Sequence, residues 1–532
     1  MRKSFWIAGF YLIALALFVV VAAGITIRLT HPLPSLEGRS APPPLPGISA
    51  TRLGRAIQPE AARHPGTSGV HAIPDPHEAF AARVMLARAA ERTLDIQYYI
   101  WRADRSGSLL FQAVLEAADR GVQVRLLLDD NNTSGMDGLL AALDRHPNIE
   151  VRLFNPFALR SPRLIGYLTD FDRLNRRMHN KSFTADGQAT IIGGRNVGDE
   201  YFGAADGALF LDLDVLAVGP VATDVAHDFN RYWTSASAYP VDRLLPKADA
   251  ETGADPSLML SAAKDPGAAE FIEAIRRTRL VQSLVEGNLP LAWVPVRMLS
   301  DDPAKGLGVA VPETLVAHKL RELLEEPRHT LGLVSGYFVP TAAGVAAFSD
   351  MAGEGVKVSI LTNALEATDV AIVHAGYAKR RKPLLEAGIA LYETKASALG
   401  DEGASLRLSS QVSGGSSSVL RGSGSVLHAK TFTVDDRRVF IGSFNFDPRS
   451  VHLNTEMGFL IESPTLARTI HDGLVDEAPL RAYAVRLDAD GDLYWLEQVD
   501  GKTIRHDTEP GTNAVQRFVI WLLSHLPIEW ML

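Results

Sequence analysis

The sequence predicts an α/β protein of two similar lobes, each a mostly parallel mixed β-sheet flanked by helices, behind an N-terminal transmembrane helix. Three observations support this fold class. Helical stretches of ten or more residues alternate with short apolar runs, which is typical of βα units in buried sheets. The same succession of elements occurs twice along the 532 residues. The chain also opens with an apolar run long enough to cross a bilayer.

The apolar run covers residues 4–27 and lies between Arg2 and Lys3 on one side and Arg28 on the other. At about 1.5 Å per helical residue, it can span a bilayer core of roughly 30 Å. We therefore expect an uncleaved anchor over residues 1–29, with an exported catalytic body. A cleaved signal peptide is the alternative, because small residues occur near the end of the run. Residues 30–70 are rich in Pro, Gly and Ser, and we expect a linker there.

The repeated unit consists of a helix, a strand, a second helix and a second strand. Gly121 and Gly355 precede the second strand of each pass and fit helix C-caps. We expect a first lobe over residues 71–255, a second over 256–500, and an apolar helical stretch over 501–532. The predicted elements cover residues 78–92, 94–101, 107–118 and 121–128 in the first pass, and 312–326, 331–339, 342–352 and 355–361 in the second.

The composition excludes several classes of protein and site. With 46% hydrophobic and 22% charged residues, the chain is not globally disordered. A net charge of −9 counts against a protein that binds the phosphate backbone of nucleic acid. The absence of cysteine excludes disulfides, thiolate zinc sites and cysteine nucleophiles.

The chemical motif H-x-K-x4-D occurs twice, and in both copies an asparagine follows the histidine after 17 residues. Two copies with matching downstream Gly and Asn rarely arise by chance. The glycines follow apolar runs, and we expect them where the backbone approaches a ligand closely. The candidate residues are His179, Lys181 and Asn196 in the first copy and His428, Lys430 and Asn445 in the second.

Each half therefore supplies one imidazole, one ammonium group and one amide. In a strand, residues i and i+2 share a face, so the His and Lys of each motif should point the same way. Two lysines with amide donors suit the oxygens of a phosphodiester and the added charge of its transition state. Two histidines can divide the tasks of nucleophile and proton donor.

These motifs, together with residues 193–202, 442–450 and 453–456, resemble the phospholipase D superfamily, and within it the bacterial cardiolipin synthases of the C type. The resemblance implies two phospholipase D-type lobes that share one site, a covalent phosphohistidine, and no metal or other cofactor. It implies cardiolipin synthesis from phosphatidylglycerol, with phosphatidylethanolamine as a further candidate substrate. The implied partners are phospholipid substrates and the membrane, with no nucleic acid. The implied location is the bacterial inner membrane, single-pass, with a periplasmic catalytic domain; the oligomeric state stays open.

Other functions use the same motifs. With water as the acceptor, the site would be a phospholipase D that releases phosphatidic acid. A nuclease-type phosphodiesterase is a further alternative, against which the anchor and the acidic balance count. A non-catalytic membrane scaffold predicts eroded motifs, whereas both copies here are complete.

For the individual roles, we expect His179 as nucleophile and His428 as general acid and base, although the motifs alone leave the order open. Each imidazole should have an orienting carboxylate. The resemblance suggests Glu456, 28 residues after His428, and for the other half the candidate is Asp212, 33 residues after His179. Asp214 shares the face of Asp212 and could replace it, and the alternative for either aspartate is a surface carboxylate at a strand end.

The remaining features have two interpretations each. The motif residues Asp186 and Asp435 are expected in turns rather than in the chemistry. The basic segment 160–178 and the Ser/Gly-rich segment 397–425 precede the two motifs; they are either solvated insertions or a rim that touches lipid headgroups. The stretch 515–532 is either a packing helix or an interfacial membrane contact.

Overall fold

The structure is a computed structural model that describes residues 18, 22, 24–42, 44–45, 47, 50–204, 209–245, 266–280, 283, 289–324, 327–396 and 426–532. Most of the anchor expected over residues 1–29 lies outside the described residues, and so does the whole of segment 397–425. Among the described residues, no helix combines the length and the apolar character needed to span a membrane.

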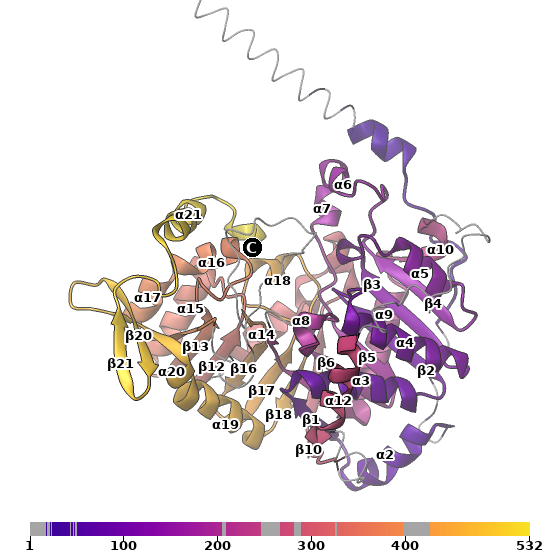
Figure 1. The fold of residues 1–532 in the computed structure, drawn as a ribbon, viewed down its shortest axis with the longest axis horizontal. Helices are drawn as coiled ribbons and strands as arrows, with labels where there is room; N and C mark the ends of the chain where they lie inside the picture. Colours follow the sequence, from indigo (N-terminus) through magenta and orange to yellow (C-terminus); the bar gives the residue numbers. More distant parts are fainter. Residues whose placement is uncertain are drawn as a thin grey trace, which may run out of the picture.

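Two lobes lie side by side, each built on one large sheet (Figure 1). Among the described residues, the first sheet has nine strands in the order β10-β1-β8-β6-β5-β2-β3-β4-β9. Their bounds are β1 (Ser68–Ile73), β2 (Thr93–Tyr98), β3 (Gln123–Asp129), β4 (Ile149–Phe154), β5 (Ser182–Ala185), β6 (Ala189–Gly193), β8 (Asp214–Val218), β9 (Ala238–Pro240) and β10 (Ala292–Val294).

The second sheet has ten strands in the described part of the chain, in the order β11-β18-β17-β16-β12-β13-β14-β19-β20-β21. Two short strands, β7 (Phe210–Leu211) and β15 (Val426–Leu427), pair with each other across the lobes. The bounds in the second sheet are β11 (Val296–Ser300), β12 (Thr330–Ser335), β13 (Lys357–Asn363), β14 (Ala390–Thr394), β16 (Lys430–Val434), β17 (Arg438–Gly442), β18 (Met457–Glu462), β19 (Ala482–Leu487), β20 (Leu493–Val499) and β21 (Lys502–His506).

The helices flank both sheets, and the eight elements of the predicted repeat correspond to α3, β2, α4 and β3 in the first lobe and α14, β12, α15 and β13 in the second. Gly121 and Gly355 follow α4 and α15 with φ of +92° each, which confirms the predicted C-cap glycines. The α-helices are α2 (Arg52–Arg63), α3 (Pro76–Ala89), α4 (Arg105–Asp119), α5 (Asp137–Asp144), α6 (Leu164–Thr169), α7 (Phe171–Leu174), α8 (Asp199–Phe202), α9 (Pro220–Trp233), α10 (Val241–Leu244), α12 (Pro266–Arg276), α14 (Val316–Leu324), α15 (Thr341–Gly353), α16 (Ala371–Ala378), α17 (Arg381–Glu386), α18 (Pro448–His452), α19 (Pro464–Asp472), α20 (Ala478–Arg481) and α21 (Ala514–Ser524). Shorter helical turns are η2 (Asp130–Asn132), η4 (Pro303–Leu307), η5 (Pro312–Thr314), η6 (Gly473–Glu477) and η7 (Glu529–Met531).

The two sheets repeat one topology, because β8-β6-β5-β2-β3-β4 corresponds strand for strand to β18-β17-β16-β12-β13-β14. Within the two large sheets, and among the described residues, only β2-β3-β4 and β12-β13-β14 pair in parallel. The other neighbouring strands of these sheets are antiparallel. The expectation of mostly parallel sheets is therefore wrong. The reason is that β5 to β6 and β16 to β17 are joined by three-residue turns, and a parallel crossover needs a dozen or more residues.

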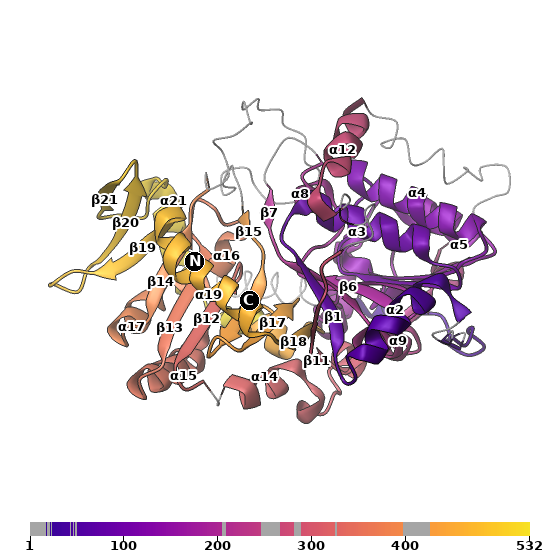
Figure 2. The same ribbon diagram turned by 90° about the horizontal axis from the view of Figure 1, so that it is seen from below.

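The lobes share a hydrophobic core. Figure 2 shows β17 and β18 facing β1 and β6 across the middle of the molecule. Ile192 and Val215 of the first sheet pack in one buried cluster with Ile441 and Phe459 of the second. The chain passes from the first sheet to the second between β10 and β11, so β10 still pairs with β1 although it lies beyond the boundary expected at residue 255.

The aspartate of each motif stabilises the start of a neighbouring strand. Asp186 accepts hydrogen bonds from the backbone N–H groups of residues 91–93, and Asp435 accepts them from residues 328–330. Both aspartates have positive φ, +54° and +51°, in the turns after β5 and β16. The expected structural role is confirmed, since each carboxylate ties the motif strand to β2 or β12.

We predict that Asp186→Ala lowers the free energy of unfolding by roughly 2 to 4 kcal/mol, because three N–H groups lose their acceptor and that of Thr93 is buried. Asp186→Asn should recover part of this loss, since its amide oxygen still accepts. Urea unfolding followed by tryptophan fluorescence measures the change, with the exposed Asp224→Ala on α9 as a control. Equal stability of the Asp186→Ala and Asp224→Ala variants would contradict the assignment.

Candidate active site

The two motifs meet at the boundary between the lobes, where each is fixed to the backbone of the other lobe. The backbone N–H of His179 donates to Thr455 O at 2.9 Å, and that of His428 donates to Leu211 O at 2.8 Å. His179 and Lys181 lie just before β5 rather than within a strand, and Lys430 is the first residue of β16. All four His and Lys side chains are buried.

The imidazole of each motif is paired with a carboxylate of the other lobe. His179 Nδ1 lies 2.9 Å from Glu456 Oε2, and His428 Nδ1 lies 2.6 Å from Asp212 Oδ2. This corrects the expectation that Glu456 serves the His428 half and Asp212 the His179 half. The β7–β15 pairing brings Asp212 to His428, and the bridge between Met178 and Thr455 brings Glu456 to His179.

The alternatives considered for the aspartates do not hold. Asp212 is only 7% exposed, so it is not a surface carboxylate. Asp214 is fully buried in an ion pair with Arg83 at 2.9 Å and lies 3.5 Å from Arg195. It therefore stabilises the fold of the first lobe and does not orient an imidazole.

The glycines before the asparagines make room for these carboxylates. A Cβ on Gly194 would lie 2.1 Å from Asp212 Oδ1, and one on Gly193 would lie 2.1 Å from Asp214 Oδ1. The close approach expected at these glycines is therefore to the protein's own acids, and any larger residue at position 194 would displace the partner of His428.

The lysines are held in matching positions. Lys181 Nζ donates to His179 O at 2.7 Å, and Lys430 Nζ donates to His428 O. Lys430 Nζ also lies 2.9 Å from His428 Nδ1. Each ammonium group is thus fixed beside its own imidazole, where an anionic phosphate would meet both.

The two asparagines are not equivalent. Asn196 accepts from Ile100 N and donates to the Tyr201 hydroxyl at 2.9 Å, so its amide is engaged within the first lobe. Asn445 is buried, and within the described part of the chain its side-chain oxygen has no hydrogen-bond partner. Asn445 Oδ1 is an acceptor that a substrate hydroxyl can use.

Several site residues were missed in the sequence. Tyr99 packs edge-on against His179 at 5.1 Å, and Tyr337 against His428 at 6.0 Å. Tyr99 is the first residue after β2 and Tyr337 the second after β12, so the two tyrosines lie near corresponding strand ends but not at equivalent positions of the repeat. Ser443 and Ser450 donate to Glu456, and only contacts in the folded chain reveal this.

Burial and the neighbouring lysines set the proton equilibria. Burial lowers the pKa of His179 well below its usual value, and Lys181 and Lys430 lower it further. Burial also lowers the pKa of His428 to about 4, with Lys430 acting the same way against Asp212. Both imidazoles are therefore neutral near pH 7 and can act as nucleophile or base.

The two carboxylates differ. Burial raises the pKa of Asp212, but His428 and Lys430 outweigh it, so the pKa lies below its usual value. Burial raises the pKa of Glu456 to about 7, although Lys181 opposes this. Asp212 is thus ionised at neutral pH, while Glu456 is present in both its protonated and its ionised form at that pH.

Most arginines of segment 160–178 form ion pairs within the first lobe. Arg160 and Arg163 form ion pairs with Asp130 and Asp137, and Arg177 pairs with Asp129. These three guanidinium groups do not form a free headgroup-binding rim. Among the described residues, no group of three or more His, Asp or Glu could hold a metal ion.

We predict that the site binds sulfate, a probe that keeps its charge from pH 7 to 9, and that affinity falls as pH rises through about 8. Burial lowers the pKa of Lys430 to about 8, against the pull of Asp212, so this ammonium group is charged below that pH and neutral above it. Lys430→Met should weaken binding about tenfold at pH 7 and remove this fall. Calorimetric titration measures both effects, and an affinity independent of pH in the unaltered protein would contradict the assignment.

Comparison with known proteins agrees with this geometry. A family model described as "Cardiolipin synthase, PLD-like domain" matches residues 84–233 and 320–474. A cardiolipin synthase C of Escherichia coli is 49% identical over 486 residues, which cover 90% of this chain and 100% of that protein. A major cardiolipin synthase of Bacillus subtilis is 24% identical over 404 residues, with 76% of this chain and 67% of that protein covered.

The fold is also found in a solved structure. The crystal structure of a phosphatidylserine synthase of Haemophilus influenzae matches with a TM-score of 0.55 at 14% identity, covering 90% of this chain and 100% of that one. The resemblance read from the motifs is confirmed by the family match and by the Escherichia coli relative. The chain belongs to the phospholipase D-like family of cardiolipin synthase domains.

Proposed function

We propose that the protein is a phosphatidyltransferase that makes cardiolipin by transesterification of phosphatidylglycerol, with phosphatidylethanolamine as a further candidate substrate. The observation that carries this proposal is the pair of complete half-sites joined by the crossed His179–Glu456 and His428–Asp212 contacts. The names of the relatives support the same reaction.

In the first half-reaction, His179 Nε2 attacks the phosphorus of the donor lipid and forms an N–P bond. The bond from phosphorus to the headgroup alcohol breaks, and the leaving oxygen takes a proton from His428. This imidazole is neutral in the empty site and becomes an imidazolium when the bound phosphodiester anion adds its negative charge to that of Asp212. Lys181 and Lys430 neutralise the charge that develops on the phosphoryl oxygens. Glu456 stabilises the positive charge that His179 gains.

In the second half-reaction, His428 is neutral and takes the proton of the incoming hydroxyl. The alcohol oxygen attacks phosphorus, the N–P bond breaks, and His179 is released. With a phosphatidylglycerol hydroxyl as acceptor the product is cardiolipin; with water it would be phosphatidic acid. Burial of His179, Lys181, His428 and Lys430 supports transfer to a lipid alcohol, because it limits access of bulk water.

The carboxylates favour this division of roles. An ionised Asp212 keeps a proton on His428 Nδ1 and stabilises its imidazolium form, as a general acid requires. Glu456, with its pKa near 7, suits a histidine whose charge appears only in the covalent intermediate. We further propose a single-pass protein of the bacterial inner membrane, anchored by residues 1–29, with its catalytic domain on the periplasmic side.

The reaction is tested by mixing the purified protein with vesicles of phosphatidylglycerol, with and without phosphatidylethanolamine, and separating the products by mass. We expect cardiolipin and free glycerol from phosphatidylglycerol alone. His179→Ala and His428→Ala should each lower turnover by about a thousandfold or more. Phosphatidic acid as the sole product would contradict the transferase, and turnover in either variant near that of the unaltered protein would contradict the shared site.

The pH dependence of kcat/KM separates the two carboxylates. Activity that needs ionised Glu456 should rise as pH passes through about 7, because its pKa is raised to that value. Glu456→Gln should remove this limb and lower kcat on the order of a hundredfold. The matched Asp212→Asn should also lower kcat but keep the limb, since the pKa of Asp212 is depressed. If kcat/KM of Glu456→Gln still rose with pH near 7, the assignment of this rise to Glu456 would be contradicted.

A further inference from the structure

Most of the exposed large apolar side chains of the described residues lie in three segments, while others, such as Val309, Val311 and Leu480, lie elsewhere. Residues 24–30 expose Ile25 and Leu29, and α6–α7 exposes Leu164, Leu168 and Phe171. The segment from α21 to η7 exposes six more, namely Val515, Phe518, Trp521, Leu522, Leu526 and Trp530. We call these three segments together the apolar rim.

The apolar rim lies on one side of the molecule. In Figure 1, residues 24–30, α6–α7 and α21 all lie along the upper edge, above both sheets. Arg449 joins two of the segments, since its guanidinium donates to Asn175 O at 2.7 Å, directly after α7, and to Met531 O at 3.1 Å, in η7. Arg449 is four residues after Asn445, so the segments converge beside the active site.

Two of the rim segments, α6–α7 and α21 to η7, are also linked to an imidazole of the site through a tyrosine. In the first lobe, Tyr167 of α6 donates to Asn131, and the adjacent Asn132 donates to Tyr99 O at 3.2 Å. The Tyr99 ring packs against His179. Three contacts therefore connect Tyr167 of α6 with the first imidazole.

The second lobe repeats this arrangement. Tyr337 packs against His428 and donates to Asp369 at 2.7 Å, directly before α16. Ala375 of α16 packs with Ile520, the buried side chain of α21. This contact leaves the opposite face of α21, with Phe518 and Trp521, exposed.

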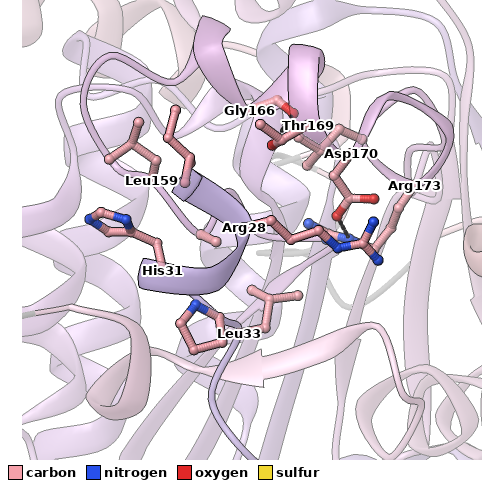
Figure 3. A pocket seen from close by; sticks show the side chains of 12 residues that line it. Arg28, His31, Leu33, Leu159, Gly166, Thr169, Asp170 and Arg173 are labelled. Carbon is pink, nitrogen blue, oxygen red and sulfur yellow. Dashed lines mark hydrogen bonds and ion pairs between the residues drawn. The ribbon is translucent and has the colours of Figure 1, made fainter. Parts of the chain in front are cut away.

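The N-terminal chain reaches the same side. Residues 24–30 include the end of the uncharged run 4–27 and lie against α6, where a Cβ added to Gly24 would be 3.5 Å from Thr169 Cγ2. A cavity of about 370 Å³ separates Arg28 and His31 from Asp170 and Arg173 (Figure 3). An apolar run that enters a bilayer would thus bring the apolar rim to the bilayer surface.

We infer that the apolar rim is a docking surface for a phospholipid bilayer and presents the shared site to lipids that stay in that bilayer. The inference rests on the proposed function, because acyl chains that remain in the bilayer require the site to lie at its surface. Tryptophan at the edge of an apolar face, with Arg28 nearby, suits the boundary between acyl chains and headgroups.

Because the natural chain has no cysteine, single cysteines can carry a fluorescent probe at chosen positions of the full-length protein. Leu168→Cys and Trp521→Cys place the probe on the rim. Leu480→Cys in α20 is the matched control, since Leu480 is 62% exposed and Leu168 is 69% exposed. Each protein is reconstituted into phosphatidylglycerol–phosphatidylcholine vesicles that contain a lipid with a spin label high on its acyl chain.

We expect about twofold or greater quenching at both rim positions and little at the control. Weak quenching at all three positions overturns the inference, whatever product the unaltered protein makes. Rim quenching without cardiolipin formation supports the docking surface and contradicts the proposed function. Cardiolipin formation without rim quenching supports the proposed function and contradicts the docking surface.

A second measurement distinguishes loss of docking from loss of folding. Leu164→Ser combined with Phe518→Ser should raise KM for vesicle-embedded phosphatidylglycerol about tenfold. It should leave kcat/KM on monomeric short-chain phosphatidylglycerol unchanged. Equal loss on both substrates would overturn the inference, because the rim would then serve folding or chemistry and not docking.

Discussion

The crossed pairing of His179 with Glu456 and of His428 with Asp212 is the constraint on which the rest of the site depends. Neither lobe can orient its own catalytic imidazole, so neither half-site is complete until the lobes close on each other. The shared core around Ile192 and Ile441 and the short β7–β15 pair serve this closure. Internal duplication has thus given two incomplete units and one complete site.

Closure also sets the electrostatics. Two lysines, two imidazoles and two carboxylates share a buried volume. Burial is the largest cause of the pKa shifts of both lysines, both imidazoles and Glu456, whereas at Asp212 the neighbouring His428 and Lys430 outweigh it. Opposite charges balance within the set, which makes the burial of so many ionisable groups tolerable. A phosphodiester entering this volume meets two lysines and two neutral imidazoles, and the ionised Asp212 lies beside His428. The same burial that costs stability prepares the site for an anion.

The sequence predicted the repeat, its helices and the six motif residues, because hydrophobic periodicity and motif spacing are local signals. The structural role of Asp186 and Asp435 followed from their places in turns. Strand direction was not predictable in this way, since it depends on which strands pair, and short turns after β5 and β16 make those strands antiparallel. The partners of His179 and His428 were assigned within each half because sequence distance carries no information about contacts between lobes. Tyr99 and Tyr337 were missed because single tyrosines have no motif, and they lie one residue out of register in the repeat.

The crossed pairing can be tested most directly by nitrogen NMR of the protein labelled only in its 15 histidines. The ring resonances of His179 and His428 are assigned from the spectra of His179→Ala and His428→Ala. The account predicts that Glu456→Gln moves the resonances of His179 and leaves those of His428 nearly in place, while Asp212→Asn does the opposite. If each carboxylate variant instead perturbed the imidazole of its own lobe, the central claim would be contradicted.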